Sequence, residues 1–292
     1  MKDLSIVIVN FNTREKLRMC LTTVFASSPG IQFEVFVVDN ASSDGSVAMA
    51  RAEFPKAEVI VNGENLGFSR ANNVALRQAS GRYLLLLNPD VEIMPDTFQK
   101  MLQFMDQNPR VGVAGCRVEK PDGSLDLACR RGFPDPTTAF LRLTGLSLLF
   151  PKSRMASYNL TYLPEDEISE VDSVMGAFLL IRREAMDQVG FLDEDYFMYG
   201  EDLDWCFRVK ASGWRVVYAP ITRVIHHKGS ASRKVPRLAL LEFHRAMAIF
   251  YDKHYRAHYG FFMNFFVKFG IWGRYLLKSL GNMLRREKYV SK

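Results

Sequence analysis

Short, almost wholly apolar segments alternate with longer polar and apolar stretches from the start to about residue 118, and this alternation constrains the fold most. The short segments include IVIV, VFVV and YLLLL. Strands buried on both faces of a parallel sheet have such composition, whereas strands with one solvated face alternate. Strands that alternate with helices form βαβ units. We therefore predict an α/β fold with a doubly wound, mostly parallel central sheet.

The expected elements follow from these patterns. The predicted strands are Ser5–Val9, Glu34–Asp39, Glu58–Asn62, Tyr83–Leu87 and Val111–Val118, and the predicted helices between them are Thr13–Ser27, Ser46–Phe54, Gly67–Ala79 and Asp96–Asn108. Residues 119–172 mix Pro, Gly, Ser and Arg with one apolar patch, Phe140–Phe150, and predict a loop with an embedded helix. Beyond this loop we expect a strand over Asp172–Arg182, a helix over Arg183–Val189 and a strand that ends at His226.

The opening residues and the cysteines indicate the compartment. The apolar run Leu4–Val9 follows Asp3 and has no small-residue cleavage site behind it, so it predicts a buried strand instead of a signal peptide. The four cysteines form no C-x-x-C pair and match no common zinc spacing. Reduced, buried thiols suit a reducing environment. We therefore expect a cytoplasmic protein.

Charge is unevenly distributed along the chain. Residues 229–292 hold 13 Lys and Arg against 3 Asp and Glu, so they carry +10, and residues 1–228 carry −4 of the net +6. A basic segment of this kind can bind nucleic acid, an anionic membrane or an acidic partner. The arrangement of the apolar residues within this basic segment distinguishes among the three kinds of partner.

Residues 260–284 predict an amphipathic helix, because large apolar residues gather on one face at about 100° per residue and cations on the other. The apolar face comprises Phe261, Phe262, Phe265, Phe266, Phe269, Trp272, Leu276, Leu277, Leu280 and Leu284, and the cations are Lys268, Arg274, Lys278, Arg285 and Arg286. We expect this helix to lie on the anionic inner face of the cell membrane. The alternative is packing on the preceding α/β domain or on a second subunit of a homo-oligomer. Nucleic acid is not expected, because the aromatic residues lie opposite the cations.

Polar residues follow four of the predicted strands. They are the segments Asn10–Asn12, Asp39–Ser46, Asn62–Asn65 and Asn88–Asp90. Open parallel sheets bind ligands beyond the carboxyl ends of their strands. Asn, Asp, Ser and Gly are also ordinary turn and cap residues, so each segment alone can be structural. Together, on one edge of the sheet, the four segments predict a binding site.

The motifs also limit the kind of nucleotide site. No G-x-G-x-x-G follows the first strand, and no G-x-x-x-x-G-K-[ST] occurs. Instead, the blocks SIVIVNFN, VVDNASSDGS, NGENLGFSRANNVAL, LLLLNPDV, GEDLDWCFR and VIHHKGSAS occur in this order. Their order resembles the family 2 glycosyltransferases of GT-A fold, and most of all their rhamnosyltransferase-like branch. The resemblance implies a catalytic domain over residues 1–232 and a basic helical extension over residues 233–292.

The resemblance places several residues at the nucleotide sugar. They are Asn10, Asn12, Asp39, Asn65, Gly67, Arg70, Asn73 and Asn88. A carboxylate such as that of Asp39 can accept a hydrogen bond from a pyrimidine N–H or a ribose hydroxyl. The start of the helix at Gly67 suits anions. Arg70 can equally be an ordinary surface arginine.

The resemblance also implies a divalent cation. The family's D-x-D element corresponds here to Asn88–Asp90, so Asp90 inherits the metal role, while Asn88 is a weaker ligand than aspartate. Few protein ligands are available, so the cation would be Mg²⁺ or Mn²⁺, completed by diphosphate oxygens and water. His226 corresponds to a family histidine near the metal or the diphosphate. A histidine at the end of a strand can also be an ordinary surface residue.

Glycosyl transfer with inversion needs a base that takes the proton from the attacking acceptor hydroxyl. It also needs a positive charge that stabilises the departing diphosphate. GEDLDW resembles the family's E-D motif, which makes Asp202 the base and Glu201 a neighbour that orients the acceptor or tunes the base. Lys228 and Arg233 can supply positive charge. The alternative interpretation of GEDLDW is a solvated acidic loop before a helix.

These expectations combine into one function. We expect a metal-dependent inverting glycosyltransferase at the cytoplasmic membrane face, which moves a sugar, first of all rhamnose from dTDP-rhamnose, to a saccharide or lipid-linked acceptor in cell-surface polysaccharide synthesis. One alternative is a sugar-phosphate nucleotidyltransferase, which would need a glycine-rich loop where NFNTREKL has no glycine. Another is a non-catalytic, membrane-bound nucleotide-sugar sensor, which would lack the Glu201–Asp202 pair.

Overall fold

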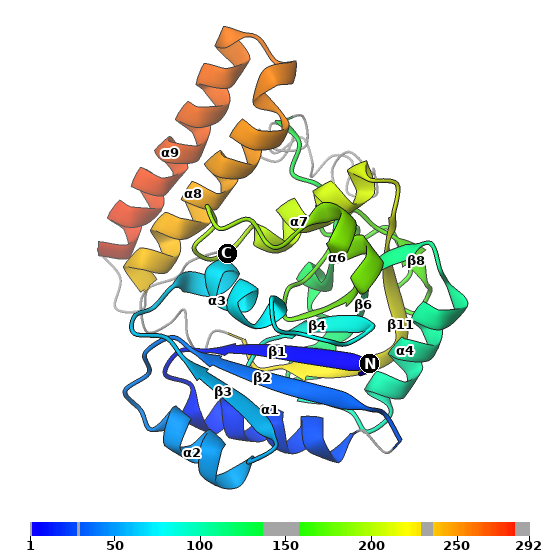
Figure 1. The fold of residues 1–292 in the computed structure, drawn as a ribbon. Coiled ribbons are helices and arrows are strands. Elements are labelled where there is room, and N and C mark those ends of the chain that lie inside the picture. The colour runs from blue at the N-terminus through cyan, green and yellow to red at the C-terminus, as the bar shows by residue number, and fades with distance from the viewer. Residues whose placement is uncertain (1, 28–29, 137–157, 229–235, 284–292) are drawn as a thin grey trace.

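The computed structural model describes residues 2–27, 30–136, 158–228 and 236–283, and it has the predicted α/β fold (Figure 1). The central sheet has the strand order β3-β2-β1-β4-β10-β6-β11-β5, and β8 pairs with β11 outside this path. Strands β1 to β4 pair in parallel, as do β6 and β11. The patch Phe140–Phe150 lies outside the described residues.

The strands are β1 (Leu4–Asn10), β2 (Phe33–Asp39), β3 (Ala57–Val61), β4 (Tyr83–Leu87), β5 (Val91–Ile93), β6 (Val111–Glu119), β7 (Arg130–Arg131), β8 (Ser169–Glu170), β9 (Ser173–Val174), β10 (Phe178–Arg182) and β11 (Arg215–His226). The α-helices are α1 (Arg14–Ala26), α2 (Ser46–Glu53), α3 (Gly67–Leu76), α4 (Thr97–Gln107), α6 (Arg183–Val189), α7 (Glu201–Ala211), α8 (Pro236–His254) and α9 (Phe261–Met283). The elements predicted for the first 118 residues are confirmed, although β5 was not predicted and α3 ends three residues early.

The prediction of one continuous strand over Asp172–Arg182 is wrong. This segment divides into β9, which pairs with β7 in a separate two-stranded sheet, and β10, which runs antiparallel between β4 and β6. The physical reason lies at Gly176, whose backbone N–H donates to Asp202 Oδ2 at 2.9 Å instead of to a neighbouring strand. The break therefore brings the chain to the start of α7.

Helices cover both faces of the sheet. α1 and α2 lie on one face, and α3, α6 and α7 on the other (Figure 1). Every residue of β1, β4 and β10 is buried, which explains why their sequences do not alternate between apolar and polar residues. This core leaves the carboxyl ends of β1, β2 and β4 at one edge of the sheet.

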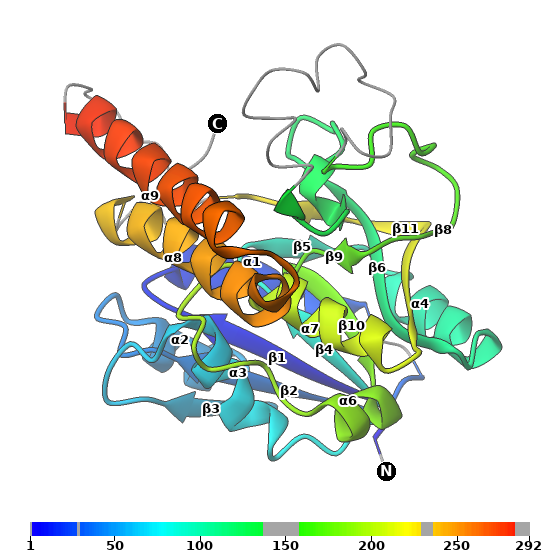
Figure 2. The same ribbon diagram turned by 90° about the horizontal axis from the view of Figure 1, so that it is seen from above.

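The predicted C-terminal helical extension is α8 and α9, which lie side by side (Figure 2). Tyr196 and Leu203, beside and within α7, form an apolar cluster with Ala246 and Phe250 of α8. On α9, Ile271 is buried, and Lys268 Nζ lies 2.9 Å from the carboxylate of Asp252 on α8. One side of α9 therefore packs on α8, within the extension itself.

The other side of α9 is exposed. Its exposed large apolar residues are Phe261, Phe262, Met263, Phe265, Phe266, Phe269, Trp272, Leu276, Leu277 and Leu280. Leu284, Arg285 and Arg286 lie outside the described residues, as does the expected boundary between residues 232 and 233. Within the described ranges, no helix is both long enough and apolar enough to cross a bilayer.

Candidate active site

The residues expected at the nucleoside form a network at the ends of β1 and β2. Asn10 donates from Nδ2 to Asp39 Oδ2 at 2.7 Å and to Ser42 Oγ at 3.1 Å, and its Oδ1 accepts from Thr13 Oγ1 at 2.6 Å. Asp39 Oδ1 accepts from the backbone of Ser42 at 2.8 Å. Asn10 and Asp39 are buried, so in this structure they hold the two loops together.

Two non-glycine residues of these loops have left-handed backbone conformations. Asn12 has φ 54° and Ala41 has φ 60°. Asn12 accepts from the backbone N–H of Ser43 at 2.8 Å and donates its own N–H to Ser42 Oγ at 2.8 Å. Such conformations are uncommon, cost about 1–3 kcal/mol, and gather at ligand-binding loops. The crossed hydrogen bonds fix this edge of the sheet in a specific shape.

The block from Asn65 to Asn73 contacts the loop before α7. A Cβ on Gly67, which has φ +79°, would lie 2.4 Å from the carbonyl oxygen of Phe197, so only glycine fits. Asn73 is buried, and it donates to Leu192 O at 2.8 Å and accepts from Leu192 N at 3.1 Å. The structure thus gives Gly67 and Asn73 packing roles that the sequence did not reveal.

The two other residues of this block are more accessible. Asn65 accepts from the backbone of Gly67 at 3.0 Å, which shapes the start of α3. Arg70 is exposed and lies 3.8 Å from Glu194 Oε2, a distance typical of a loose surface ion pair. Arg70 can therefore reorient toward a ligand.

The residues expected at the metal lie together. β5 pairs with β11 so that Val91 faces His226, and this register places Asp90 beside the histidine. His226 Nε2 is 3.1 Å from Asp90 Oδ1 and 3.5 Å from Asn88 Nδ2. Asp90 and His226 are both buried. The interpretation of His226 as an ordinary surface residue is wrong, because its side chain is buried.

Asp126, which was not predicted, lies on the other side of His226. Its Oδ2 is 3.7 Å from His226 Nδ1 and 2.6 Å from Lys228 Nζ. Burial alone would raise the pKa of Asp126, but contacts with His226 and Lys228 lower it to about 2. Burial likewise opposes charge on His226, yet the facing carboxylates of Asp126 and Asp90 raise its pKa. Lys228 thus neutralises Asp126, and Arg233 lies outside the described residues.

The pair of Asp90 and His226 fits a divalent cation. Two neighbouring ligands of an octahedral ion at about 2.1 Å are about 3.0 Å apart, close to the observed 3.1 Å. Metal-binding histidines commonly donate their second ring nitrogen to a carboxylate, and Asp126 faces that nitrogen. Across the described ranges, no group of three or more His, Cys, Asp or Glu can hold a metal. The remaining ligands would have to come from the donor and water.

The expected base lies at the start of α7, which Gly200 precedes with φ 81°. Asp202 is buried, and its Oδ2 accepts from Arg131 Nη2 at 2.7 Å and from Gly176 N at 2.9 Å. Next to Gly176, the carbonyl of Ala177 accepts from Asn88 N at 3.1 Å. Gly176 and Ala177 therefore connect Asp202 with the Asn88–Asp90 segment.

Glu201 is also buried, and its Oε2 accepts no hydrogen bond within the described part of the chain. Burial and then the charge of Asp202 raise the pKa of Glu201 to about 8. Both carboxyls lie inside the protein, so the interpretation of GEDLDW as a solvated loop is wrong.

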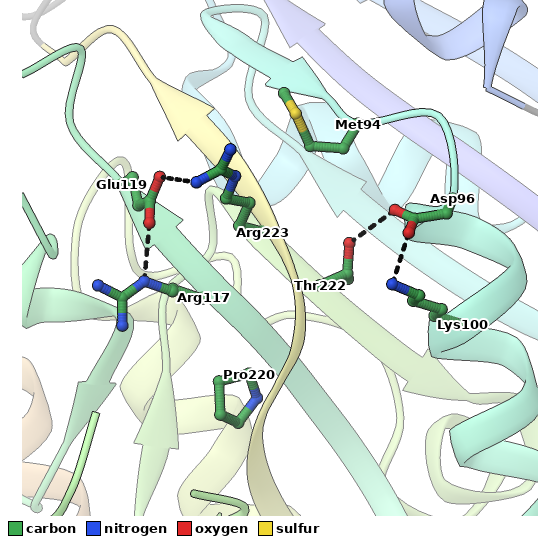
Figure 3. A pocket seen from close by; sticks show the side chains of 8 residues that line it. All are labelled: Met94, Asp96, Lys100, Arg117, Glu119, Pro220, Thr222 and Arg223. Atoms are coloured by element: carbon green, nitrogen blue, oxygen red, sulfur yellow. Dashed lines mark hydrogen bonds and ion pairs between the residues drawn. The ribbon is translucent and has the colours of Figure 1, made fainter. Parts of the chain in front are cut away.

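A separate pocket of about 440 Å³ is lined by side chains of β6 and β11 and of the segment Met94–Lys100 (Figure 3). Its charged groups pair with one another: Glu119 contacts Arg117 and Arg223, and Asp96 contacts Lys100. None of the predicted site residues lines it. We therefore assign it no part in the candidate active site.

The fold is shared with solved glycosyltransferases of GT-A fold. The mannosyltransferase PcManGT from Pyrobaculum calidifontis, in complex with GDP-Man and Mn²⁺, matches with a TM-score of 0.59 and 17% identity over 88% of this chain and 66% of that one. Residues 1–349 of S. aureus TarS match with a TM-score of 0.56 and 16% identity over 95% and 82%. The protein therefore has a GT-A fold with C-terminal helices.

Sequence comparison defines the family. The pattern of Glycosyl transferase family 2 matches residues 5–190, and that of Glycosyl transferase family group 2 matches residues 148–285. The N-acetylglucosaminyl-diphospho-decaprenol L-rhamnosyltransferase of Mycobacterium tuberculosis is 30% identical over 75% of both chains. Rhamnosyltransferase WbbL of Escherichia coli is 26% identical over 76% of this chain and 82% of its own. The chain belongs to glycosyl transferase family 2 and is similar to its rhamnosyltransferases.

Proposed function

We propose that the protein transfers a sugar, rhamnose in the first instance, with inversion from a nucleoside diphosphate to a lipid-linked glycan. The observation that carries this proposal is the connection of Asp202, through Gly176 and Ala177, to the Asn88–Asp90 element. The relatives support the choice of sugar and acceptor. One is named for L-rhamnose and a diphospho-decaprenol acceptor, and another is named an O-antigen biosynthesis protein.

In the proposed reaction, Asp202 accepts the proton of the acceptor hydroxyl as that oxygen attacks the anomeric carbon. The bond between this carbon and the diphosphate oxygen breaks, and the electron pair leaves with the diphosphate. Asp202 is buried at the N-terminus of α7, and its Oδ2 lies 2.7 Å from Nη2 of Arg131, so positive charge faces this carboxyl. An ionised carboxylate is the form that a base needs.

Asp90 and His226 would hold the divalent cation, with Asp126 orienting the imidazole. When bound, Mg²⁺ or Mn²⁺ would supply positive charge to the departing diphosphate. Asn88 lies within reach of His226 and contributes an amide at this position. The nucleoside would lie against the edge formed by Asn12 and Asp39, while Arg70 reaches the donor from the start of α3.

The exposed face of α9 supports a role at an anionic membrane, with the helix lying in the interface. Its apolar residues form a continuous stripe on one face of the helix, and Arg274 and Lys278 lie on the opposite face. A lipid-linked acceptor would be presented at such a surface. We therefore propose that α9 brings the enzyme to its acceptor at the inner face of the membrane.

A screen of nucleoside diphosphate sugars tests the function. The purified protein is incubated with each donor, Mn²⁺ and a short lipid-linked acceptor, and release of the nucleoside diphosphate is measured. We expect dTDP-rhamnose to be used, and donor binding to raise the melting temperature even without acceptor. If no donor binds or turns over with either Mg²⁺ or Mn²⁺, the proposed function is wrong.

A further inference from the structure

We propose that Arg131 is a positioning residue that keeps the negative charge of the Glu201–Asp202 pair on Asp202, so that Glu201 remains a hydrogen-bond donor. This proposal rests on the proposed function, in which Asp202 is the base. Arg131 belongs to β7, far from α7 in the sequence, and no motif marks it. Its role is inferred from its contact with Asp202 in the structure.

The contacts of Arg131 are directed at one carboxyl only. Its Nη2 lies 2.7 Å from Asp202 Oδ2, 3.1 Å from Ser173 Oγ and 2.9 Å from the carbonyl of Val174. The side chains of Arg131 and Asp202 are 10% and 9% exposed, so water screens this ion pair little. Among the described residues, no hydrogen bond joins Arg131 to Glu201, so the guanidinium distinguishes two adjacent acids.

The surroundings of Glu201 favour its protonated form. Besides Asp202, the nearby carboxylate of Asp204 acts against a second negative charge, and burial adds to both effects. Asp204 itself forms an ion pair with Arg208 at 2.8 Å, and its Oδ1 lies 2.7 Å from Nε2 of His254 on α8. Within the described ranges, Oε2 of Glu201 has no such partner. Burial and like charge thus raise the pKa of Glu201, in agreement with the contacts.

An ionised Asp202 beside a protonated Glu201 would give the two carboxyls different chemical roles. An ionised carboxyl only accepts hydrogen bonds, whereas a protonated one offers an O–H donor. Glu201 Oε2 has no hydrogen-bond partner among the described residues although it is buried. A protonated Glu201 could therefore donate to a hydroxyl or ring oxygen of a bound sugar, while Asp202 removes the acceptor's proton. Without Arg131, one proton would be shared between the two acids, and neither role would be defined.

The test compares Arg131→Met with Arg130→Met. Arg130 is a buried arginine of the same strand, and its guanidinium contacts the backbone carbonyls of Leu163 and Pro164. In Arg131→Met, we expect the acid limb of the kcat/KM pH profile to move up by about one unit or more, because a charge that favours the ionised form of the base is lost. Donor affinity should stay within about twofold, and Arg131→Lys should restore most of the profile. Arg130→Met should keep the wild-type acid limb.

A second measurement needs no substrate. In protein with ¹³C-labelled carboxyls, the Asp202 signal, assigned by its loss in Asp202→Asn, should titrate at higher pH in Arg131→Met than in the wild type. If Arg131→Met does not fold, Arg131→Lys provides the comparison, and its Asp202 signal should shift in the same direction by a smaller amount. Unchanged titration in the folded variant would overturn the proposal. Inactivity of the wild type with every donor would instead refute the proposed function and leave the titration as the test of Arg131.

Discussion

Replacement of Phe262, Phe266 and Phe269 by serine should release the protein from anionic vesicles. These side chains lie on one face of α9 and are 76%, 64% and 67% exposed. Full burial of a phenylalanine is worth about 1.5–3 kcal/mol, so covering the exposed two-thirds contributes about 1–2 kcal/mol per residue. The triple change should therefore weaken binding by about 3–6 kcal/mol, or by a factor of about 10²–10⁴.

Surface substitutions are preferable to deletion of the helix. Ile271 is buried, and the ring of Tyr275 lies 5.6 Å from that of His244 on α8, so deletion would expose α8. The matched control changes the same three phenylalanines to leucine, which keeps the surface apolar and should retain most of the binding. Melting temperatures should be nearly the same in all variants, because the replaced side chains are exposed.

The electrostatic part of binding is tested separately with Lys278→Glu. Each cation near an anionic leaflet is worth about 1 kcal/mol, so the reversal should weaken binding by about 2 kcal/mol. The effect should be absent on zwitterionic vesicles and smaller at high salt. Lys268 is less suitable, because its ion pair with Asp252 joins α9 to α8.

Co-sedimentation with vesicles, measured against lipid concentration, decides whether α9 binds the protein to a membrane. Equal binding of the serine variant and the wild type would refute the membrane role. If the wild type ignores vesicles and the serine variant alone elutes as a smaller species in gel filtration, the apolar face instead covers a second copy of the chain.

The remaining predictions concern the site. Asp202→Asn should lower transfer by about 10²–10⁴-fold with donor affinity unchanged, and wild-type kcat in this variant would exclude the base role. Because it leaves Arg131 buried without a counter-charge, it should also cost about 3–5 kcal/mol of stability, so activity is measured well below its melting temperature. Asp90→Ala should remove the effect of Mn²⁺ on donor affinity in calorimetric titrations, whereas Asn88→Asp should strengthen this effect. Equal donor affinities of the wild type with metal and with chelator would contradict the metal role. The pKa of Glu201 is raised from its ordinary 4.5 to about 8, so its contribution to stability is complete below pH 4.5 and is lost as the pH rises through 8. Glu201→Gln should thus gain stability over the wild type between pH 5 and 9, and parallel melting curves across this range would show that Glu201 is not protonated in the folded state.

Much of this molecule could be predicted from local patterns. Segments such as YLLLL predicted strands buried on both faces, because the period of the apolar residues depends only on neighbours in the chain. The parallel arrangement then forces the carboxyl ends of the strands to one edge, which placed Asn10 and Asp39 together before any contact was known. The apolar face of α9 followed in the same way from helical periodicity.

Other features depend on residues that are distant in the sequence. The carboxylate of Asp202 meets Arg131 across 71 positions, and Asn73 meets Leu192 across 119. Neither Arg131 nor Asp126 belongs to a motif, since an isolated arginine or aspartate in a loop-like stretch carries no signal of its partner. The antiparallel insertion of β10 was equally hidden, because a buried strand has the same composition in either direction.

The sequence by itself determined the parallel strands β1 to β4, the edge that carries the polar segments and the amphipathic helix, because periodicity and strand connection act over short distances. The acids of the E-D element followed from the resemblance to the family. Only the tertiary structure decided that Asp202 and not Glu201 meets Arg131, and that His226 lies between Asp90 and Asp126. Charges act through space and are strongest where water is excluded. Their partners are therefore chosen by packing, which no short stretch of sequence records.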